Sequence, residues 1–454
     1  MRLWTSADIA AATGGTASGD FAVTGIAFDS REIGDGDLFV AMPGTAHDGH
    51  DFLATAFERG AAGAIVSRPI AEPHVLVADT AAALDALARA SRRRAAAKIV
   101  GVTGSVGKTG TKEALAAALA RTPGLRVHRS VKSYNNHTGV PLSLARLPAD
   151  SDYAVFEMGM NHAGEIAALT RQVRPHVALV TTIAPAHIEF FPTGLDGIAD
   201  AKGEIFQGLE PGGTAIIPFD SPQRDRLIAA ARVHAATILT FGMGEGADVR
   251  ARDVIDNGDS STVTATLPGV ELCLTVGQAG AHWVSNALAV LAAVHALGAD
   301  IGVAALALGD VEQLAGRGAR LRIVAGAGEA LLIDESYNAN PASMRATLAV
   351  LGNEAGRKIA VLGEMRELGQ QSAELHAGIA DDVTAAGVEM VVLVGEAMTP
   401  LAQALEGRVA LRHVADAATA TTLLATLIAP GDAILVKGSN GVGLSSLVEN
   451  LGAK

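Results

Sequence analysis

The sequence predicts an α/β protein with three domains: a small α/β domain at the N terminus, a central domain on a mostly parallel sheet, and a Rossmann-like domain at the C terminus. The chain has 454 residues, which is too long for a single hydrophobic core. From about residue 98 to 315, short apolar segments of strand character alternate with helical segments, a pattern typical of a parallel sheet covered by helices. The same alternation returns after residue 316 and predicts a doubly wound sheet. We therefore expect domains at residues 1–80, 81–315 and 316–454.

The first domain is predicted from short apolar segments separated by turn residues. Gly34-Asp35-Gly36-Asp37 and Pro43-Gly44 are turn signals. The predicted strands are residues 22–28, 37–41, 64–66 and 75–77. A helix over residues 81–97 then leads into the central domain.

The other two domains are predicted from longer apolar segments. In the central domain the expected strands are residues 98–102, 153–158, 177–183 and 215–218, with a β-rich stretch at 248–276 and a long helix at 283–297. In the third domain the expected strands are residues 330–333, 358–362, 391–394 and 433–436.

Composition excludes several classes of function. The formal net charge of −13 argues against nucleic acid as the main partner. No apolar run reaches the length of a membrane span, since the best one, 287–294, is stopped by His295. The single cysteine, Cys273, excludes an intrachain disulfide and a cysteine-based metal site. We expect a cytoplasmic protein that does not span a membrane.

Residues 101–109 are the most informative segment, reading Gly-Val-Thr-Gly-Ser-Val-Gly-Lys-Thr between a predicted strand and an alanine-rich helix. A glycine-rich turn there exposes backbone N–H groups at the positive end of the helix, Lys108 adds charge, and the Thr109 hydroxyl can bind Mg²⁺. The strict P-loop pattern requires glycine at position 102, where this chain has Val102. A flexible turn is the alternative, but we expect this loop to bind ATP or GTP.

Metal-ligand side chains follow two apolar segments after this loop. Val155-Phe156 runs into Glu157, and residues 181–186 run into His187. Because ligands bind at the carboxyl ends of parallel strands, both side chains could face the nucleotide. Alone, each is as readily a cap, a surface group or a structural residue. Lys202, in Ala-Lys-Gly-Glu-Ile-Phe, is by its chemistry alone an exposed helix lysine near Glu204.

Two further segments carry polar groups in suggestive places. Residues 331–341 are an apolar strand that ends in Asp334 and Glu335 and continues into an Asn-rich turn. This segment lies too far from Lys108 in the chain for the same small sheet, so we expect another domain to supply it. Asn286, at the start of the long helix, can offer a donor and an acceptor to a purine. Helix capping and an Asx turn are the structural alternatives.

Together these segments resemble the Mur ligase family. The loop, Glu157, His187, Lys202 and the entry to the long helix occur in that family's order and spacing. The third-domain strings resemble the member that adds D-alanyl-D-alanine; they are residues 334–341, 361–369, 374–376 and 435–439. Residues 28–31, 37–41 and 48–52 are similar to the family's nucleotide-sugar-binding domain. The resemblance covers nearly the whole chain.

The resemblance implies an ATP-dependent amide ligase that acts through an acyl phosphate. It would add D-Ala-D-Ala to a UDP-N-acetylmuramoyl tripeptide and give the pentapeptide precursor of peptidoglycan. The first domain would then bind the UDP substrate, the central P-loop-type domain would be the ATPase, and the third would close over ATP and bind the dipeptide. The implied cofactors are ATP and two Mg²⁺ ions. We expect a monomer.

The resemblance also assigns roles to residues. The implied catalytic residues are Lys108, His187 and Lys202, with Lys202 carbamylated by CO₂, and the implied Mg²⁺ ligands are Thr109, Glu157, His187 and Lys202. The implied ATP-binding residues are Thr103, Gly104, Ser105, Val106, Gly107, Lys108, Thr109, Asn286, Arg317 and Asp334. The implied substrate-binding residues are Ser30, Arg31, Asn135 and Asn136.

The chain departs from the family pattern at three places. Trp283 stands where a small or amide residue is usual, which leaves Asn286 as the purine contact. Glu335 stands where a second Asp is common, so either acid could face the nucleotide. Lys132-Ser133 replaces a Gly-containing approach to residues 134–136.

Three other functions are the alternatives. A family member that adds a single amino acid is disfavoured by the third-domain strings. A folate polyglutamate ligase is disfavoured by the dedicated first domain. A GTPase switch or ATP-driven assembly factor is disfavoured because the sequence lacks Asn-Lys-x-Asp, and dependence of phosphate release on a UDP-linked peptide would separate it from a ligase.

Overall fold

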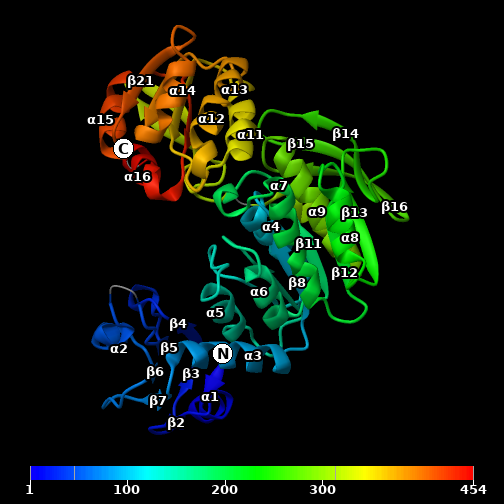
Figure 1. Cartoon of the computed structure of the whole chain (residues 1–454), viewed down its shortest axis with the longest axis vertical. Helices are drawn as coiled ribbons and strands as arrows, with labels where there is room; N and C mark the ends of the chain where they lie inside the picture. The colour runs from blue at the N-terminus through cyan, green and yellow to red at the C-terminus, as the bar shows by residue number, and fades with distance from the viewer. Residues whose placement is uncertain (1, 45–46, 312, 453–454) are drawn as a thin grey trace.

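The structure is a computed structural model that describes residues 2–44, 47–311 and 313–452. These residues form sheets of nine, six, five and two strands. Figure 1 shows three bodies, with the central one joined to both others. The predicted fold class, α/β with mostly parallel sheets, is confirmed. We find no helix in the described ranges with the length and hydropathy that a transmembrane segment requires.

The N-terminal body is built on a five-stranded sheet in the order β2-β7-β6-β5-β4, and β1 pairs with β3 beside it. Its strands are β1 (Trp4–Thr5), β2 (Thr16–Ala17), β3 (Ala22–Val23), β4 (Gly25–Ala27), β5 (Asp37–Val40), β6 (Gly63–Val66) and β7 (His74–Leu76). Its helices are α1 (Ser6–Thr13), η1 (Ser30–Glu32), η2 (Gly49–Phe52) and α2 (Leu53–Glu58). The predicted single strand at 22–28 is wrong: it is two strands in two sheets, because the Thr24 N–H leaves the ladder and donates to the Gly36 carbonyl at 2.9 Å.

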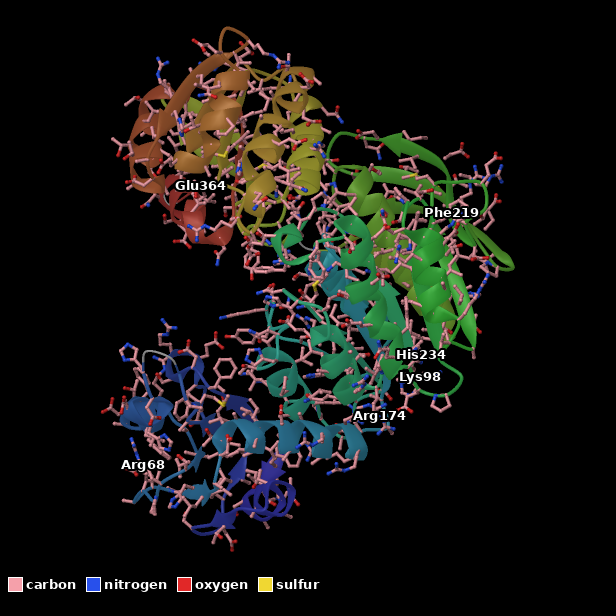
Figure 2. All side chains as sticks on the ribbon, in the orientation of Figure 1. Arg68, Lys98, Arg174, Phe219, His234 and Glu364 are labelled. Atoms are coloured by element: carbon pink, nitrogen blue, oxygen red, sulfur yellow. The ribbon has the colours of Figure 1, made fainter. Side chains whose placement is uncertain are left out.

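The helix α3 (Thr80–Arg94) links this body to the central one. The Asp79 side chain caps it by accepting from the N–H groups of Ala81 and Ala82. The helix ends earlier than predicted because Ala95 is extended. In Figure 2, where all side chains are drawn, Arg68 marks the N-terminal body, Phe219 the central body and Glu364 the C-terminal body.

The central body holds the nine-stranded sheet in the order β16-β15-β14-β13-β12-β11-β8-β10-β9. Its strands are β8 (Lys98–Thr103), β9 (Val127–Arg129), β10 (Tyr153–Glu157), β11 (Val177–Val180), β12 (Thr214–Pro218), β13 (Thr237–Gly242), β14 (Val249–Asp256), β15 (Ser261–Leu267) and β16 (Val270–Val276). Its helices are α4 (Lys108–Ala120), α5 (Gly139–Ala145), α6 (Glu165–Val173), η3 (Ile188–Phe190), α7 (Leu195–Gly203), η4 (Glu204–Gly208), α8 (Arg224–Ala231), α9 (Ala281–Leu297) and α10 (Ile301–Gly309). The β-rich stretch at 248–276 is confirmed as three strands, antiparallel to one another.

The C-terminal body holds the six-stranded sheet in the order β17-β18-β22-β19-β20-β21, parallel except for β17. Its strands are β17 (Ala319–Ala325), β18 (Gly328–Glu335), β19 (Lys358–Gly363), β20 (Met390–Val394), β21 (Ala410–Val414) and β22 (Ala433–Lys437). Its helices are α11 (Pro341–Gly352), η5 (Gly369–Gln371), α12 (Ser372–Ala377), α13 (Ala380–Ala385), η6 (Glu396–Met398), α14 (Thr399–Ala404), α15 (Ala417–Leu427), η7 (Asn440–Val442) and α16 (Leu444–Gly452). The sequence prediction omits β17 and β21, whose residues are largely half-buried or exposed.

The two faces of the central sheet are covered differently. Residues of α4, α9 and α10 pack on one face, where α9 is buried along almost its whole length. Residues of α6 and α7 pack on the other face. Because β8 and β10 are parallel neighbours, their carboxyl ends lie at the same edge of the sheet. The start of α4, which follows β8, lies there too. Parallel sheets bind their ligands at this edge.

Candidate active site

The predicted phosphate loop connects β8 to α4, and two of its glycines adopt positive φ values, 149° for Gly104 and 87° for Gly107. A Cβ on Gly104 would lie 1.9 Å from Thr181 Oγ1, and one on Gly107 would lie 2.6 Å from Asn286 Oδ1. Only glycine therefore fits both positions. Lys108 Nζ donates to the Gly104 carbonyl at 2.7 Å, so the lysine side chain folds back over the loop.

A carboxylate lies beside the hydroxyl at the start of α4. Thr109 Oγ1 donates to Glu157 Oε2 at 2.8 Å, and Asn135 Nδ2 donates to Oε1 at 2.7 Å. The Thr109 hydroxyl and the buried Glu157 carboxylate are oxygen donors of the kind that Mg²⁺ prefers. No three His, Cys, Asp or Glu side chains in the described ranges gather to hold a metal by themselves. The pair fits an ion that is completed by substrate phosphates and water.

His187 lies in a segment that differs from the prediction. β11 ends at Val180, so the expected strand over residues 177–183 is too long, and the segment 181–186 that leads to His187 is not a strand. The Thr181 N–H still donates to the Thr103 carbonyl at the end of β8 at 2.9 Å, but beyond it the backbone binds the phosphate loop, since the Ser105 N–H donates to the Thr182 carbonyl at 2.7 Å. Thr181 Oγ1 also donates to the Val106 carbonyl at 2.5 Å. The segment still brings His187 to the cavity beside the loop.

The charge state of His187 suits metal binding. Burial first, and then the charges of Lys108 and Lys202, lower the pKa of His187 to about 4, so its ring is neutral at physiological pH, as metal binding requires. Its backbone is left-handed, with φ of 57°. Its Nδ1 lies 2.5 Å from Glu367 Oε2 of the C-terminal body, and burial raises the pKa of Glu367.

Lys202 is not the exposed lysine that its chemistry alone predicts. It lies on α7 and is 1% exposed. No carboxylate forms an ion pair with it in the described parts of the chain. Burial, and then the charge of Lys108, lower the pKa of Lys202 well below its ordinary value. A neutral amine is the form that reacts with CO₂.

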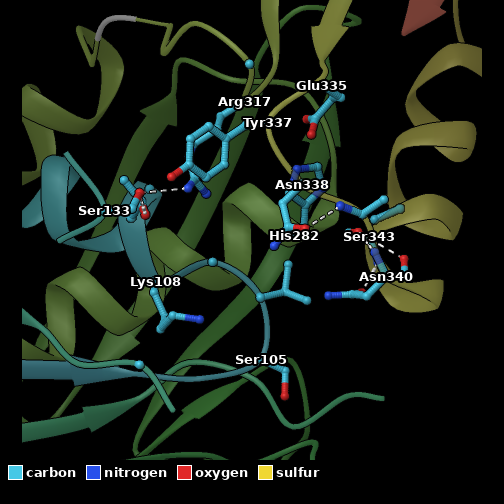
Figure 3. A pocket seen from close by; sticks show the side chains of 18 of the residues that line it. Ser105, Lys108, Ser133, His282, Arg317, Glu335, Tyr337, Asn338, Asn340 and Ser343 are labelled. Carbon is cyan, nitrogen blue, oxygen red and sulfur yellow. Dashed lines mark hydrogen bonds between the residues drawn. The ribbon is translucent and has the colours of Figure 1, made fainter. Parts of the chain in front are cut away.

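The segment that enters the C-terminal body brings Arg317 to the cavity. Arg317 Nη2 donates to Ser133 Oγ at 3.0 Å, and its guanidinium lies 4.1 Å from the centre of the Tyr337 ring. Figure 3 shows Arg317 beneath that ring, with a dashed line to Ser133. Asp334 anchors this segment, because Oδ2 accepts the Gly316 N–H at 2.6 Å. Glu335, and not Asp334, lines the cavity.

These groups surround a cavity of about 300 Å³ between the central and C-terminal bodies. It is lined by Ser105, Val106, Gly107, Lys108, Thr109, Gly110, Ser133, Asn135, Glu157, Gly159, Met160, Asn161, His187, His282, Trp283, Asn286, Gly316, Arg317, Glu335, Tyr337, Asn338, Ala339, Asn340, Ser343, Ala346, Thr347 and Lys437. Its polar groups include hydrogen-bond donors of the phosphate loop, two further cations, and asparagine amides from both bodies. The loop donors suit the phosphates of a nucleotide, and the amides suit a base that forms hydrogen bonds.

The predicted substrate residues lie further away. Ser30 and Arg31 belong to η1 in the N-terminal body, where Arg31 binds Asp29. Asn136 Oδ1 accepts from the N–H groups of Thr138 and Gly139 at the turn before α5. Asn135 lines the cavity. Their roles in substrate binding stay predictions.

Several residues of the cavity are absent from the sequence prediction. They are Ser133, His282, Tyr337, Asn338, Asn340 and Lys437. Lys437 Nζ, at the end of β22, lies 3.2 Å from Glu335 Oε2. The Asn-rich turn after β18 is a signal that could have indicated Asn338 and Asn340, and Asn340 also caps α11. Lys437 lies in the family-like string 435–439 and Ser133 in the departure at 132–133, but neither pattern indicates that the side chain lines the cavity.

Family models match most of the chain. The Mur ligase family catalytic domain matches residues 22–102, the Mur ligase middle domain residues 102–294, and the Mur ligase glutamate ligase domain residues 319–440.

Similar proteins match over nearly their whole length. A UDP-N-acetylmuramoyl-tripeptide–D-alanyl-D-alanine ligase of Escherichia coli is 35% identical, covering 95% of this chain and 94% of that one. The protein of that name from Rickettsia prowazekii is 32% identical over 98% and 99%. A crystal structure of MurF from Acinetobacter baumannii has a TM-score of 0.86, with 34% identity and 99% coverage of both chains. MurF ligase from Thermotoga maritima, in complex with ADP, has a TM-score of 0.78, with 27% identity over 95% and 97%. The chain belongs to the Mur ligase family.

Proposed function

We propose that this Mur ligase joins D-Ala-D-Ala to the peptide carboxylate of a UDP-N-acetylmuramoyl tripeptide, at the expense of ATP. The relatives that carry this name cover nearly the whole chain. The observation that carries the proposal is the shared cavity, because it joins the phosphate loop of the central body to donors of the C-terminal body. A ligase needs a site that two bodies can close together, since water would hydrolyse an acyl phosphate.

The reaction follows from the chemistry of amide formation. The peptide carboxylate attacks the γ-phosphorus of ATP, ADP leaves, and an acyl phosphate forms. The amine of D-Ala-D-Ala then attacks the acyl carbon, and phosphate leaves from the tetrahedral intermediate as the nitrogen loses a proton. Lys108 and Arg317 supply positive charge where two anions must meet. Thr109 and Glu157 would hold Mg²⁺, which when bound neutralises phosphate charge.

For Lys202 we propose carbamylation. The neutral amine adds CO₂ and releases a proton, which turns a buried neutral amine into an anion with two oxygen ligands. Its burial beside Lys108 supports this, because burial and a neighbouring positive charge both favour the neutral amine. Lys202→Ala should be nearly inactive, and formate or acetate should partly restore its activity. Formate or acetate should not restore the activity of Lys202→Arg, since its guanidinium keeps a positive charge at that place. Full activity of Lys202→Arg would exclude the carbamate.

The finer assignments are proposals of the same kind. Residues 1–80 would bind the UDP-linked substrate through Ser30 and Arg31, residues 81–315 would bind ATP, and residues 316–454 would bind the dipeptide. Nucleotide contacts from Asn286 and Arg317 are proposed on both sides of the cavity. We place the enzyme in the cytoplasm, where ATP and nucleotide-linked precursors occur, and expect it to work as a monomer.

A coupled assay tests the reaction. Phosphate release is measured with ATP, UDP-linked tripeptide and D-Ala-D-Ala, each omitted in turn. We expect release to require all three and the product to gain two alanines. Ligation of free meso-diaminopimelate or L-lysine in place of the dipeptide would refute the specificity, and release without the UDP-linked peptide would favour a switch-type ATPase.

A further inference from the structure

Four side chains from four separate segments form one continuous row of hydrogen bonds along the cavity wall. Arg317 Nη2 lies 3.0 Å from Ser133 Oγ, which lies 3.2 Å from Thr109 Oγ1, which lies 2.8 Å from Glu157 Oε2. The row begins at the entry to the C-terminal body and ends at the last residue of β10. It connects the segment before β17 with the first turn of α4.

The direction of every bond in this row is fixed by counting protons. A carboxylate only accepts, so the single hydroxyl proton of Thr109 goes to Glu157. Thr109 Oγ1 can then only accept from Ser133, and Ser133 must donate its proton to Thr109. Arg317 has donors alone and donates to Ser133. A guanidinium at one end and a carboxylate at the other polarise both hydroxyls in the same sense, which strengthens each bond.

The backbone holds Ser133 firmly in this place. Lys112 Nζ, fully buried on α4, donates to the carbonyls of Ser130 at 2.9 Å and Lys132 at 2.5 Å. Ser130 Oγ in turn accepts the N–H of Glu157 at 2.9 Å. The Lys132 backbone is left-handed, with φ of 50°, a conformation that a non-glycine residue keeps only where its surroundings impose it. The Ser133 hydroxyl is therefore presented at a fixed position.

We propose that Ser133 is a positioning residue that ties Arg317, at the entry to the C-terminal body, to Thr109 in the nucleotide cradle. It holds the guanidinium over the mouth of the phosphate loop and, by donating to Thr109, leaves one lone pair of that hydroxyl free to face the cavity. Without Ser133, the Arg317 guanidinium would lose this hydrogen bond and keep its contact with the Tyr337 ring. The inference rests on the proposed nucleotide role of Arg317.

Calorimetric titration with ADP, with and without Mg²⁺, tests this. Ser133→Ala should weaken ADP binding about tenfold, since it removes a hydrogen bond to a charged group. Ser133→Thr keeps the hydroxyl and should bind within about twofold of the parent. In an Arg317→Ala background, Ser133→Ala should add less than about twofold, because the partner it positions is gone.

The controls separate positioning from simple loss of stability. Ser91 is buried on α3 outside the cavity and donates to the Leu147 carbonyl at 3.0 Å. Ser91→Ala should lower the thermal midpoint of unfolding without changing ADP affinity. Amide hydrogen exchange of residues 314–318 should be faster in Ser133→Ala than in either the parent or Ser91→Ala.

Each contrary result has its own meaning. If Arg317→Ala weakens ADP binding but Ser133→Ala does not, the positioning role is wrong and the nucleotide site stands. If the two substitutions weaken binding additively, Ser133 acts independently of Arg317, and the coupling is refuted. If Arg317→Ala leaves ADP binding unchanged, both the proposed nucleotide contact and the role of Ser133 in presenting it are wrong.

Discussion

The first turn of α4 carries a glycine packed against a tryptophan, and enlarging that glycine tests the shape of the cavity directly. In Gly110→Ala the new Cβ would lie 2.8 Å from Cη2 and 3.0 Å from Cζ3 of Trp283, so one of the two groups must move. Trp283 is 8% exposed and has little room. Alanine gains about 0.5–1 kcal/mol over glycine in a helix, whereas overpacking costs about 1–3 kcal/mol. We expect a net loss of about 1 kcal/mol in the free energy of unfolding.

Fluorescence can report this change, because the chain has two tryptophans and Trp4→Phe leaves Trp283 alone. Denaturant unfolding is compared between Trp4→Phe and the same protein with Gly110→Ala. Since Gly110 and Trp283 both line the cavity, moving either should also weaken ADP binding. The double variant Gly110→Ala/Trp283→Leu should lose less free energy of unfolding than the sum of the two single losses, by at least about 0.5 kcal/mol. Its unfolding is followed by circular dichroism.

An ordinary helix glycine would behave in the opposite way. Gly110→Ala would then be as stable as its parent or more so, and ADP affinity would not change. That result would refute the argument that Trp283 occupies the space of the missing side chain.

Three further predictions concern the lysines and the closure of the cavity. Lys108→Ala should abolish ligation while circular dichroism and the thermal midpoint stay close to those of the parent, because its charge acts on the transferred phosphoryl group. Lys202→Met should raise the free energy of unfolding in CO₂-free, metal-free buffer, by about 1.4 kcal/mol for each unit by which the folded-state pKa of Lys202 lies below its ordinary value. Because folding lowers the pKa of Lys202, this gain in the free energy of unfolding is complete at pH values below the folded-state pKa. It disappears as the pH rises to the ordinary lysine pKa. Urea unfolding at several pH values would show this dependence. Small-angle scattering should show compaction when an ATP analogue and the UDP-linked substrate are added together; an unchanged radius of gyration would contradict closure of the third body.

The sequence predicts the phosphate loop well because all its signals are local. The glycines, Lys108 and Thr109 follow one another between a strand and a helix, and the strand before Glu157 ends as its apolar pattern predicts. The strand before His187 is predicted wrongly. It is predicted to reach residue 183, but after Thr181 its backbone binds the phosphate loop, a tertiary preference that hydropathy does not record.

The remaining groups could not be predicted from local pattern because their places depend on distant segments. Lys202 reads as an exposed lysine, yet the packing of α7 buries it completely. Ser133 is by sequence an ordinary loop serine, and only its hydrogen bond with Arg317, far along the chain, places it in the site. Asp334 and Glu335 are equivalent by sequence, but the carboxylate of Asp334 is used by the Gly316 N–H. In each case the contacts with a segment distant in the sequence, and not the residue type, decide whether the side chain belongs to the site.

The electrostatics of the cavity link these residues to one another. Burial lowers the pKa of Lys108 and of Lys202, and the charge of Lys108 lowers the pKa of Lys202 and of His187 further. Glu157 offsets part of the charge of Lys108, but keeping two buried amines close together is still unfavourable for folding. An anion placed among them, whether a polyphosphate or a carbamate on Lys202, turns repulsion into attraction. The positive charge that is unfavourable without such an anion therefore favours the anionic intermediates of ligation, and for this reason we expect Lys202→Met to be more stable and yet inactive.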